Sequence, residues 1–80
     1  MNIKEQFEKE VMPILKNNGY WQMVGIVKSW LEQEKYELIY AYILRVKYDG
    51  VWNNYKNIRT MKIRIALQDF LEVLEQDYLK

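Results

Sequence analysis

The chain has 80 residues, 12 of them basic and 11 acidic, and it contains no cysteine and no histidine. A chain of this length forms one small domain, residues 1–80, and its composition excludes disulfides, thiolate metal sites and the commonest general base. The formal net charge of +1 excludes a strong overall field directed at nucleic acid, a membrane or an acidic ligand.

Residues 3–17 form the first predicted helix. Asn2 is the predicted N-cap, and the Asn-Asn-Gly run at 17–19 predicts where the helix ends. Pro13 lacks a backbone donor, so we expect it to kink the chain or to divide the helix. One helical stripe carries the apolar side chains of Ile3, Phe7, Val11, Ile14 and Leu15.

Residues 20–33 form the second predicted helix, which has the most regular spacing. Trp21 falls on its polar side, where it either caps the helix start after Gly19 or belongs to a contact surface. The opposite side carries the apolar residues Met23, Val24, Ile26, Val27, Trp30 and Leu31.

Residues 36–48 allow two interpretations. As a strand, the segment alternates apolar and basic residues towards its end, and Asp49-Gly50 is a hairpin turn signal. As a helix, it ends with basic residues and with Gly50 just beyond, which is a good C-terminal signature. The helical interpretation places Tyr36, Ile39, Tyr40, Ile43 and Leu44 on one face.

Residues 59–65 are ambiguous in the same way, because Met61, Ile63 and Ile65 alternate with basic residues as in a strand. If a helix instead begins near residue 57, Ile58, Met61 and Ile65 lie opposite its core face. Both segments that flank the corner at 48–59 are therefore apolar on more than one face. We expect either the first helices or a second molecule to cover them. From residue 66 the spacing is helical, with one face formed by Ala66, Leu67, Phe70, Leu71, Leu74 and Tyr78.

The predicted fold is all-α, a small bundle of three to four helices. Asn53 and Asn54 favour this fold, because asparagine is poor in a return strand. The alternative is an α+β fold with two N-terminal helices, a two- or three-stranded antiparallel sheet in residues 36–65 and a C-terminal helix.

The chain offers little material for catalysis. Ser29 and Thr60 are its only hydroxyl nucleophiles apart from tyrosine, and no histidine or cysteine can activate them. Its three glycines form no phosphate-binding loop. Carboxylate pairs such as Glu5/Glu8 and Glu72/Glu75 are interpreted as solvated helix faces. We predict no enzyme, no cofactor, no metal site and no small-molecule substrate.

Basic residues concentrate between residues 45 and 64, where Asp49 is the only acidic residue. Such residues can neutralise phosphates, and nearby aromatic residues can stack on unpaired bases. Nucleic-acid binding is therefore the alternative function, and its predicted residues are Arg45, Lys47, Lys56, Arg59, Lys62 and Arg64.

The chain is also rich in aromatic residues, with three tryptophans and seven tyrosines. A core of this size cannot hide all of them, and Trp, Tyr and Arg concentrate at the energetic centres of protein interfaces. The predicted protein-contact residues are Trp21, Tyr42, Tyr48, Trp52, Tyr55 and Arg59.

The functional hypothesis is a small regulatory or inhibitory protein that acts by protein–protein contact and associates with itself as a homodimer. The charged residues among the first ten predict that no signal peptide is present, and the longest uncharged run, 17–27, is too short to cross a bilayer. We therefore expect a cytoplasmic protein that binds no membrane. The content of Lys, Asn, Ile and Tyr is typical of AT-rich genomes and is compatible with a bacterial, phage or plasmid origin.

Overall fold

The computed structural model describes residues 2–49 and 58–79, with the side chains of all these residues except 47–49 and 58–60. The described part is all-helical, which confirms the predicted fold class. Its elements are α1 (Ile3–Gln6), η1 (Phe7–Val11) and α2 (Met12–Asn17), which form one unbroken helical run, then α3 (Trp21–Glu32), α4 (Tyr36–Asp49), α5 (Ile58–Val73) and η3 (Leu74–Tyr78), the last two again one run.

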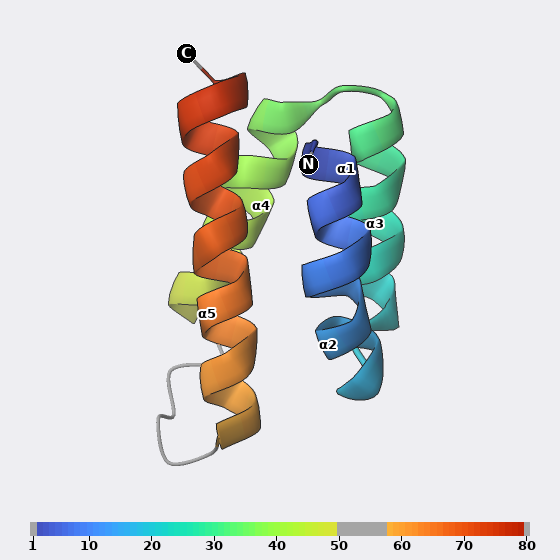
Figure 1. Cartoon of the computed structure of the whole chain (residues 1–80), viewed down its shortest axis with the longest axis vertical. Helices are drawn as coiled ribbons and strands as arrows, with labels where there is room; N and C mark the ends of the chain where they lie inside the picture. The colour runs from blue at the N-terminus through green and yellow to red at the C-terminus, as the bar shows by residue number, and fades with distance from the viewer. Residues whose placement is uncertain (1, 50–57, 80) are drawn as a thin grey trace.

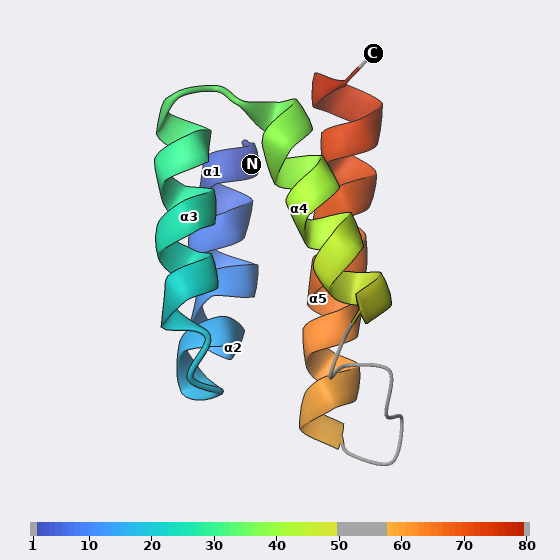
Figure 2. The same ribbon diagram turned by 180° about the vertical axis from the view of Figure 1, so that it is seen from behind.

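The four helical runs form an antiparallel bundle (Figure 1). The run α1–η1–α2 pairs with α3, and α4 pairs with α5. Contacts between α3 and α4 join the two pairs, and α5 also packs on the first run, so the N-terminal and C-terminal helices are neighbours. The view from behind shows that α3 and α4 run in opposite directions, linked by a turn at the end of the bundle that carries both termini (Figure 2).

The α+β alternative is wrong for the described residues, because 36–49 and 58–65 are helical and the described part contains no strand. The reason is visible in α5. A strand would place Met61, Ile63 and Ile65 on one face and expose them alike. Instead Ile63 is 2 % exposed, whereas Met61 is 41 % exposed and Ile65 is 56 % exposed. Burial follows the helical period instead, through Ile63, Leu67, Phe70 and Leu74.

Pro13 does not divide the first helix. It lies in the first turn of α2, directly after η1, which is a turn of π-helix. In η1 the Met12 N–H donates to the Phe7 carbonyl, five residues back. The wider turn thus ends where the proline begins, at a position where a helix tolerates the missing N–H.

The helix ends follow the sequence signals. The Asn2 side chain accepts a hydrogen bond from the Glu5 N–H at 2.8 Å, as an N-cap should. After α2, Gly19 adopts φ +81°, and the Tyr20 N–H donates to the Leu15 carbonyl at 2.9 Å. This arrangement satisfies the last carbonyls of the helix and reverses the chain.

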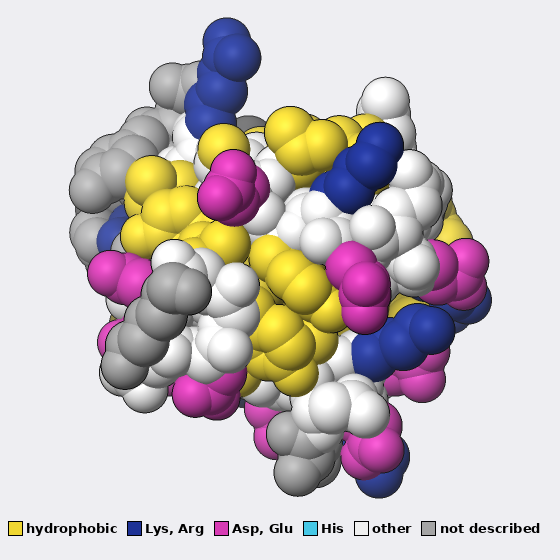
Figure 3. All heavy atoms as spheres, turned by 90° about the horizontal axis from the view of Figure 1, so that it is seen from above, with side chains coloured by type: hydrophobic (Ala, Val, Ile, Leu, Met, Phe, Trp, Pro, Cys, Tyr) yellow, Lys and Arg dark blue, Asp and Glu magenta, His cyan; other side chains and the backbone are white. Residues whose placement is uncertain are grey.

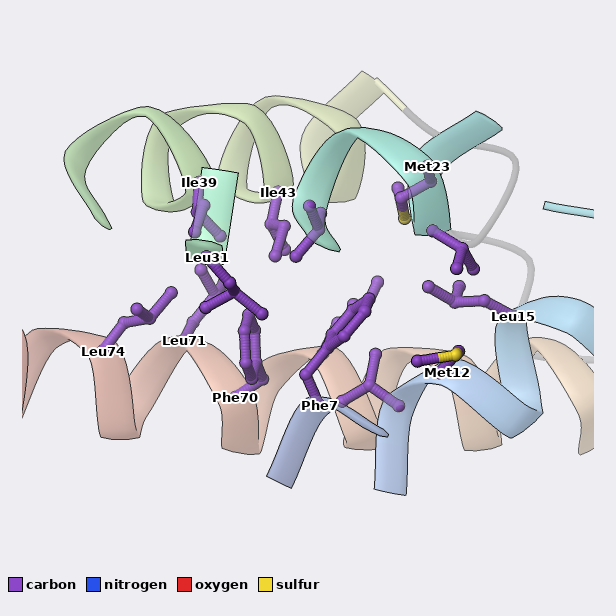
Figure 4. Close-up of a cluster of buried hydrophobic side chains, with 14 of the residues drawn as sticks. Phe7, Met12, Leu15, Met23, Leu31, Ile39, Ile43, Phe70, Leu71 and Leu74 are labelled. Carbon is purple, nitrogen blue, oxygen red and sulfur yellow. The ribbon is translucent and has the colours of Figure 1, made fainter. Parts of the chain in front are cut away.

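The core lies along the bundle axis and receives side chains from every helical run (Figure 4). Phe7 and Phe70 meet at its centre with their ring centroids 5.6 Å apart. The other buried residues include Val11 and Leu15 from the first run, Met23, Val27 and Leu31 from α3, Ile39 and Ile43 from α4, and Leu67, Leu71 and Leu74 from the last run.

Candidate functional site

Two of the predicted protein-contact residues have described side chains, and they lie in different surroundings. Trp21 begins α3 and is 61 % exposed, with the Lys16 ammonium 5.6 Å from the centre of its ring. Tyr42 is half-buried on α4 and packs edge-to-face on Trp30, with ring centroids 5.7 Å apart. Trp21 is therefore available for contact, whereas Tyr42 joins α4 to α3.

The remaining predicted contact residues lie in or near the corner between α4 and α5. Tyr48 and Arg59 belong to these helices, but their side chains are outside the described set. Trp52 and Tyr55 fall within 50–57, outside the described residues. Their roles therefore remain predictions.

Three of the six basic residues proposed for nucleic acid have described side chains. Arg45 and Lys62 are exposed and Arg64 is half-buried. Because residues two apart on a helix differ by about 200° in direction, Lys62 and Arg64 leave α5 on different sides. The side chains of Lys47 and Arg59 are not described, and Lys56 lies outside the described residues.

Lys62 borders a hollow between α5 and α2. The hollow has a volume of about 370 Å³, and its other lining residues are Ile14, Asn17 and Asn18. The Asn18 amide already donates to the Ile14 carbonyl at 2.7 Å. The hollow is thus a polar surface feature at the end of the bundle where α2 stops.

An exposed apolar pair, Met61 and Ile65, lies on the outward side of α5. The two residues are one helical turn apart, and the opposite side of the same helix already fills the core with Ile63 and Leu67. We define the α5 contact face as Met61 and Ile65 together with Lys62 and Asp69, which are exposed beside them.

Sequence reasoning anticipated this surface without assigning it as a site. A helix that begins near residue 57 was expected to place Met61 and Ile65 opposite the core, with the first helices or a second molecule covering both faces. The structure shows that α1, η1 and α2 pack on α5, while Met61 and Ile65 remain exposed. The sequence signal for Met61 and Ile65 was a second apolar stripe, on the side of this helix opposite its core face.

The opposite end of the bundle holds a pair of tyrosines, Tyr36 and Tyr78, with ring centroids 4.8 Å apart. The Tyr78 hydroxyl accepts a hydrogen bond from the Ile3 N–H at 3.1 Å, which ties the last helix to the start of the first. A groove of about 460 Å³ runs beside this pair. Figure 3 shows hydrophobic side chains exposed across this end among acidic and basic ones. The groove is lined by Glu34, Lys35, Tyr36, Glu37, Leu38, Tyr78 and Leu79.

The hydroxyl of Tyr36 is harder to ionise than an ordinary tyrosine. Partial burial raises its pKa, and the nearby Glu34 carboxylate and Tyr78 raise it further. Tyr36 therefore stays neutral over a wider pH range, with its ring packed against that of Tyr78.

Among the side chains that the structure describes, those at the two ends of the bundle carry opposite charge. Lys16, Arg45 and Lys62 lie towards the end where α4 leads to α5, which we call the basic end. The other end, which we call the acidic end, carries Glu32, Glu34, Glu37, Glu75 and Asp77 against Lys4 and Lys35. The molecule thus has a charge asymmetry along its 34 Å long axis although its net charge is only +1.

Within residues 2–49 and 58–79, no group of three or more acidic side chains is placed to hold a metal ion. No helix in this part of the chain combines the length and the apolar character needed to cross a membrane. Comparison with known proteins found no matching family, no matching curated protein and no matching solved structure.

Proposed function

We propose that this chain is a small regulatory or inhibitory protein that acts by contact with another protein, mainly through the α5 contact face. The observation that carries the proposal is the exposed pair Met61 and Ile65, on a helix whose opposite face is already buried. Large apolar side chains that adjoin on an outward face lose unfavourable water contact when a partner covers them.

Trp21 provides a second point of contact. Its ring is exposed and offers apolar surface, and the Lys16 ammonium lies over one side of the ring. Rings of this kind are common anchors at protein interfaces. The chain lacks histidine and cysteine, which supports contact over catalysis because the usual nucleophile–base pairs need one of them.

Site-specific photo-crosslinking tests the proposal. A benzoylphenylalanine residue replaces Ile65 in one variant and Lys28 in a control, since Lys28 is an exposed position on α3. We expect irradiation of cells that express the first variant to give discrete covalent adducts with protein. The control should give none, or a fainter and different set.

The adducts are identified by mass spectrometry, and circular dichroism checks that both variants fold. An adduct specific to position 65, whether with this chain or with another protein, supports the proposal. Equal labelling from both positions, or no adduct from position 65, contradicts it.

Nucleic-acid binding is the second candidate function, and the basic end favours it. Lys16, Arg45 and Lys62 are exposed there, and the Trp21 ring is exposed beside Lys16. Such a combination suits single strands, whose phosphates meet cations while bases stack on aromatic rings. Binding of oligonucleotides that weakens with salt would separate this candidate from protein contact.

A further inference from the structure

The α5 contact face carries charges of opposite sign on one flank. Lys62 precedes Ile65 by three residues and Asp69 follows it by four, so Lys62 and Asp69 are two helical turns apart and lie on the same side of the apolar pair. Both side chains are exposed, and in the part of the chain that the structure describes neither has an ion-pair partner. The face is therefore polar on its rim and opposite in sign at its two ends.

We infer that the α5 contact face binds a second copy of this chain, with the two α5 helices antiparallel and a twofold axis near Ile65. The inference rests on the proposed function, because it names the partner of the same surface. The twofold axis places Lys62 of each copy opposite Asp69 of the other, so one face supplies both halves of two equivalent ion pairs. The two Ile65 side chains meet between these pairs, and Met61 of each copy lies at the outer edge of the contact face.

A parallel pairing of the two α5 helices lacks this match. It would place Lys62 beside Lys62 and Asp69 beside Asp69, and like charges in contact cost free energy. A second copy in the antiparallel arrangement therefore matches the charges on the rim of the contact face.

The dimer is expected to be weak. Each copy offers only two large exposed apolar residues on this face, whereas stable complexes bury about 800 Å² per partner. We expect a dissociation constant on the order of 10 µM, which sedimentation equilibrium can measure.

Disulfide trapping tests the arrangement, and the absence of native cysteine makes it clean. Ile65→Cys lies beside the axis, so it should form a covalent dimer under mild oxidation. Met61→Cys and Asp69→Cys should each fail to link to themselves, because equivalent residues are then about 12 Å apart along the helices. An equal mixture of Lys62→Cys and Asp69→Cys should give the mixed dimer, because the twofold axis places these two positions opposite each other. Ser29→Cys, at an exposed position on α3, reports random collision.

A charge swap tests the ion pairs in solution. Lys62→Asp alone and Asp69→Lys alone should each weaken the dimer by about three- to tenfold, because each places two like charges in contact. The double variant Lys62→Asp/Asp69→Lys should recover the original affinity. Both substituted positions are on the surface, and far-ultraviolet circular dichroism checks that every variant remains helical.

A chain that stays monomeric to about 1 mM, a hundred times the expected dissociation constant, would overturn the inference. Self-linking of Met61→Cys would overturn the antiparallel arrangement, and so would a double variant no tighter than either single one. The photo-crosslinking experiment keeps the two proposals apart. If position 65 forms adducts with a different protein and the chain is monomeric, the contact function is supported and self-pairing is excluded. If position 65 forms no adduct at all, both the contact function and self-pairing are excluded.

Discussion

Glu34 holds a backbone conformation that ordinarily belongs to glycine. It follows α3 with φ 57°, and the Lys35 N–H donates past it to the Trp30 carbonyl at 2.9 Å. This is the same reversal that Gly19 makes after α2. A residue with a β-carbon pays a conformational cost there that glycine does not.

We expect Glu34→Gly to raise the free energy of unfolding by about 1 kcal/mol. Glu34→Gln is the matched control, because it removes the charge and keeps the β-carbon, and it should stay within about 0.5 kcal/mol of the original chain. Urea unfolding followed by circular dichroism measures both. A destabilised Glu34→Gly variant would show that the carboxylate, and not the backbone, sets the contribution of this position.

Tyr36 should make stability depend on alkaline pH. Its pKa is raised in the folded chain, chiefly by burial, so the folded state holds the phenolic proton more tightly than the unfolded state does. The resulting stabilisation is complete below the unfolded pKa and is lost as the pH rises from about 10 through the folded pKa. In urea titrations at increasing pH, the original chain should lose stability relative to Tyr36→Phe. Parallel curves for the two proteins would contradict this expectation.

At the scale of the element, α5 shows how one segment supports two periodicities. Met61, Ile63 and Ile65 alternate with basic residues, so the sequence left strand and helix open over 59–65. The helix prevails because its core face continues without interruption into the stripe of Leu67, Phe70 and Leu74. A strand over these residues would have broken that face.

The two isoleucines of α5 should therefore respond differently to truncation. Ile63→Ala removes a buried side chain and should cost about 2–5 kcal/mol, whereas Ile65→Ala should stay within about 0.5 kcal/mol. Both are measured by urea unfolding at low protein concentration, where self-association does not contribute. Equal losses at the two positions would be inconsistent with the helix as described.

The first helical run shows what periodicity could not anticipate. The apolar stripe of residues 3–17 located the helix, and Asn2 and Gly19 marked its ends. The π-helical turn at Phe7–Val11 was not predicted, because it depends on how the backbone accommodates Pro13 while Phe7, Val11 and Leu15 all stay buried.

At the scale of the whole molecule, the fold gathers basic residues that lie far apart in the sequence at one end of the bundle. Lys16 is distant in sequence from the basic segment 45–64, yet the antiparallel topology brings it to the same end as Lys62. This basic end is where a nucleic acid would bind, if phosphate recognition is the function.

If the protein functions by contact with another protein, the basic end should not bind oligonucleotides strongly. Fluorescence polarisation with labelled single- and double-stranded oligonucleotides, at about 50 and 200 mM salt, tests this, because phosphate contacts weaken steeply over that range. We expect no binding at either salt concentration. Micromolar binding that falls with salt, and that is lost in Lys62→Glu/Arg64→Glu, would favour the nucleic-acid candidate.

Local signals in the sequence were enough for several features of this protein. Helical periodicity, an asparagine cap and a glycine stop depend on neighbouring residues alone, so they located the first two helices. Asn53 and Asn54 favoured an all-α fold, because asparagine is poor in a strand. The site was anticipated less well, since Trp21 is exposed as expected but Tyr42 is taken up by packing on Trp30. The conformation of 36–49 and 58–65, the exposure of Met61 and Ile65, and the basic and acidic ends depend on which helices pack together. Whether a side chain is buried depends on the neighbours that the assembled bundle gives it, so burial cannot be determined from one stretch of the sequence.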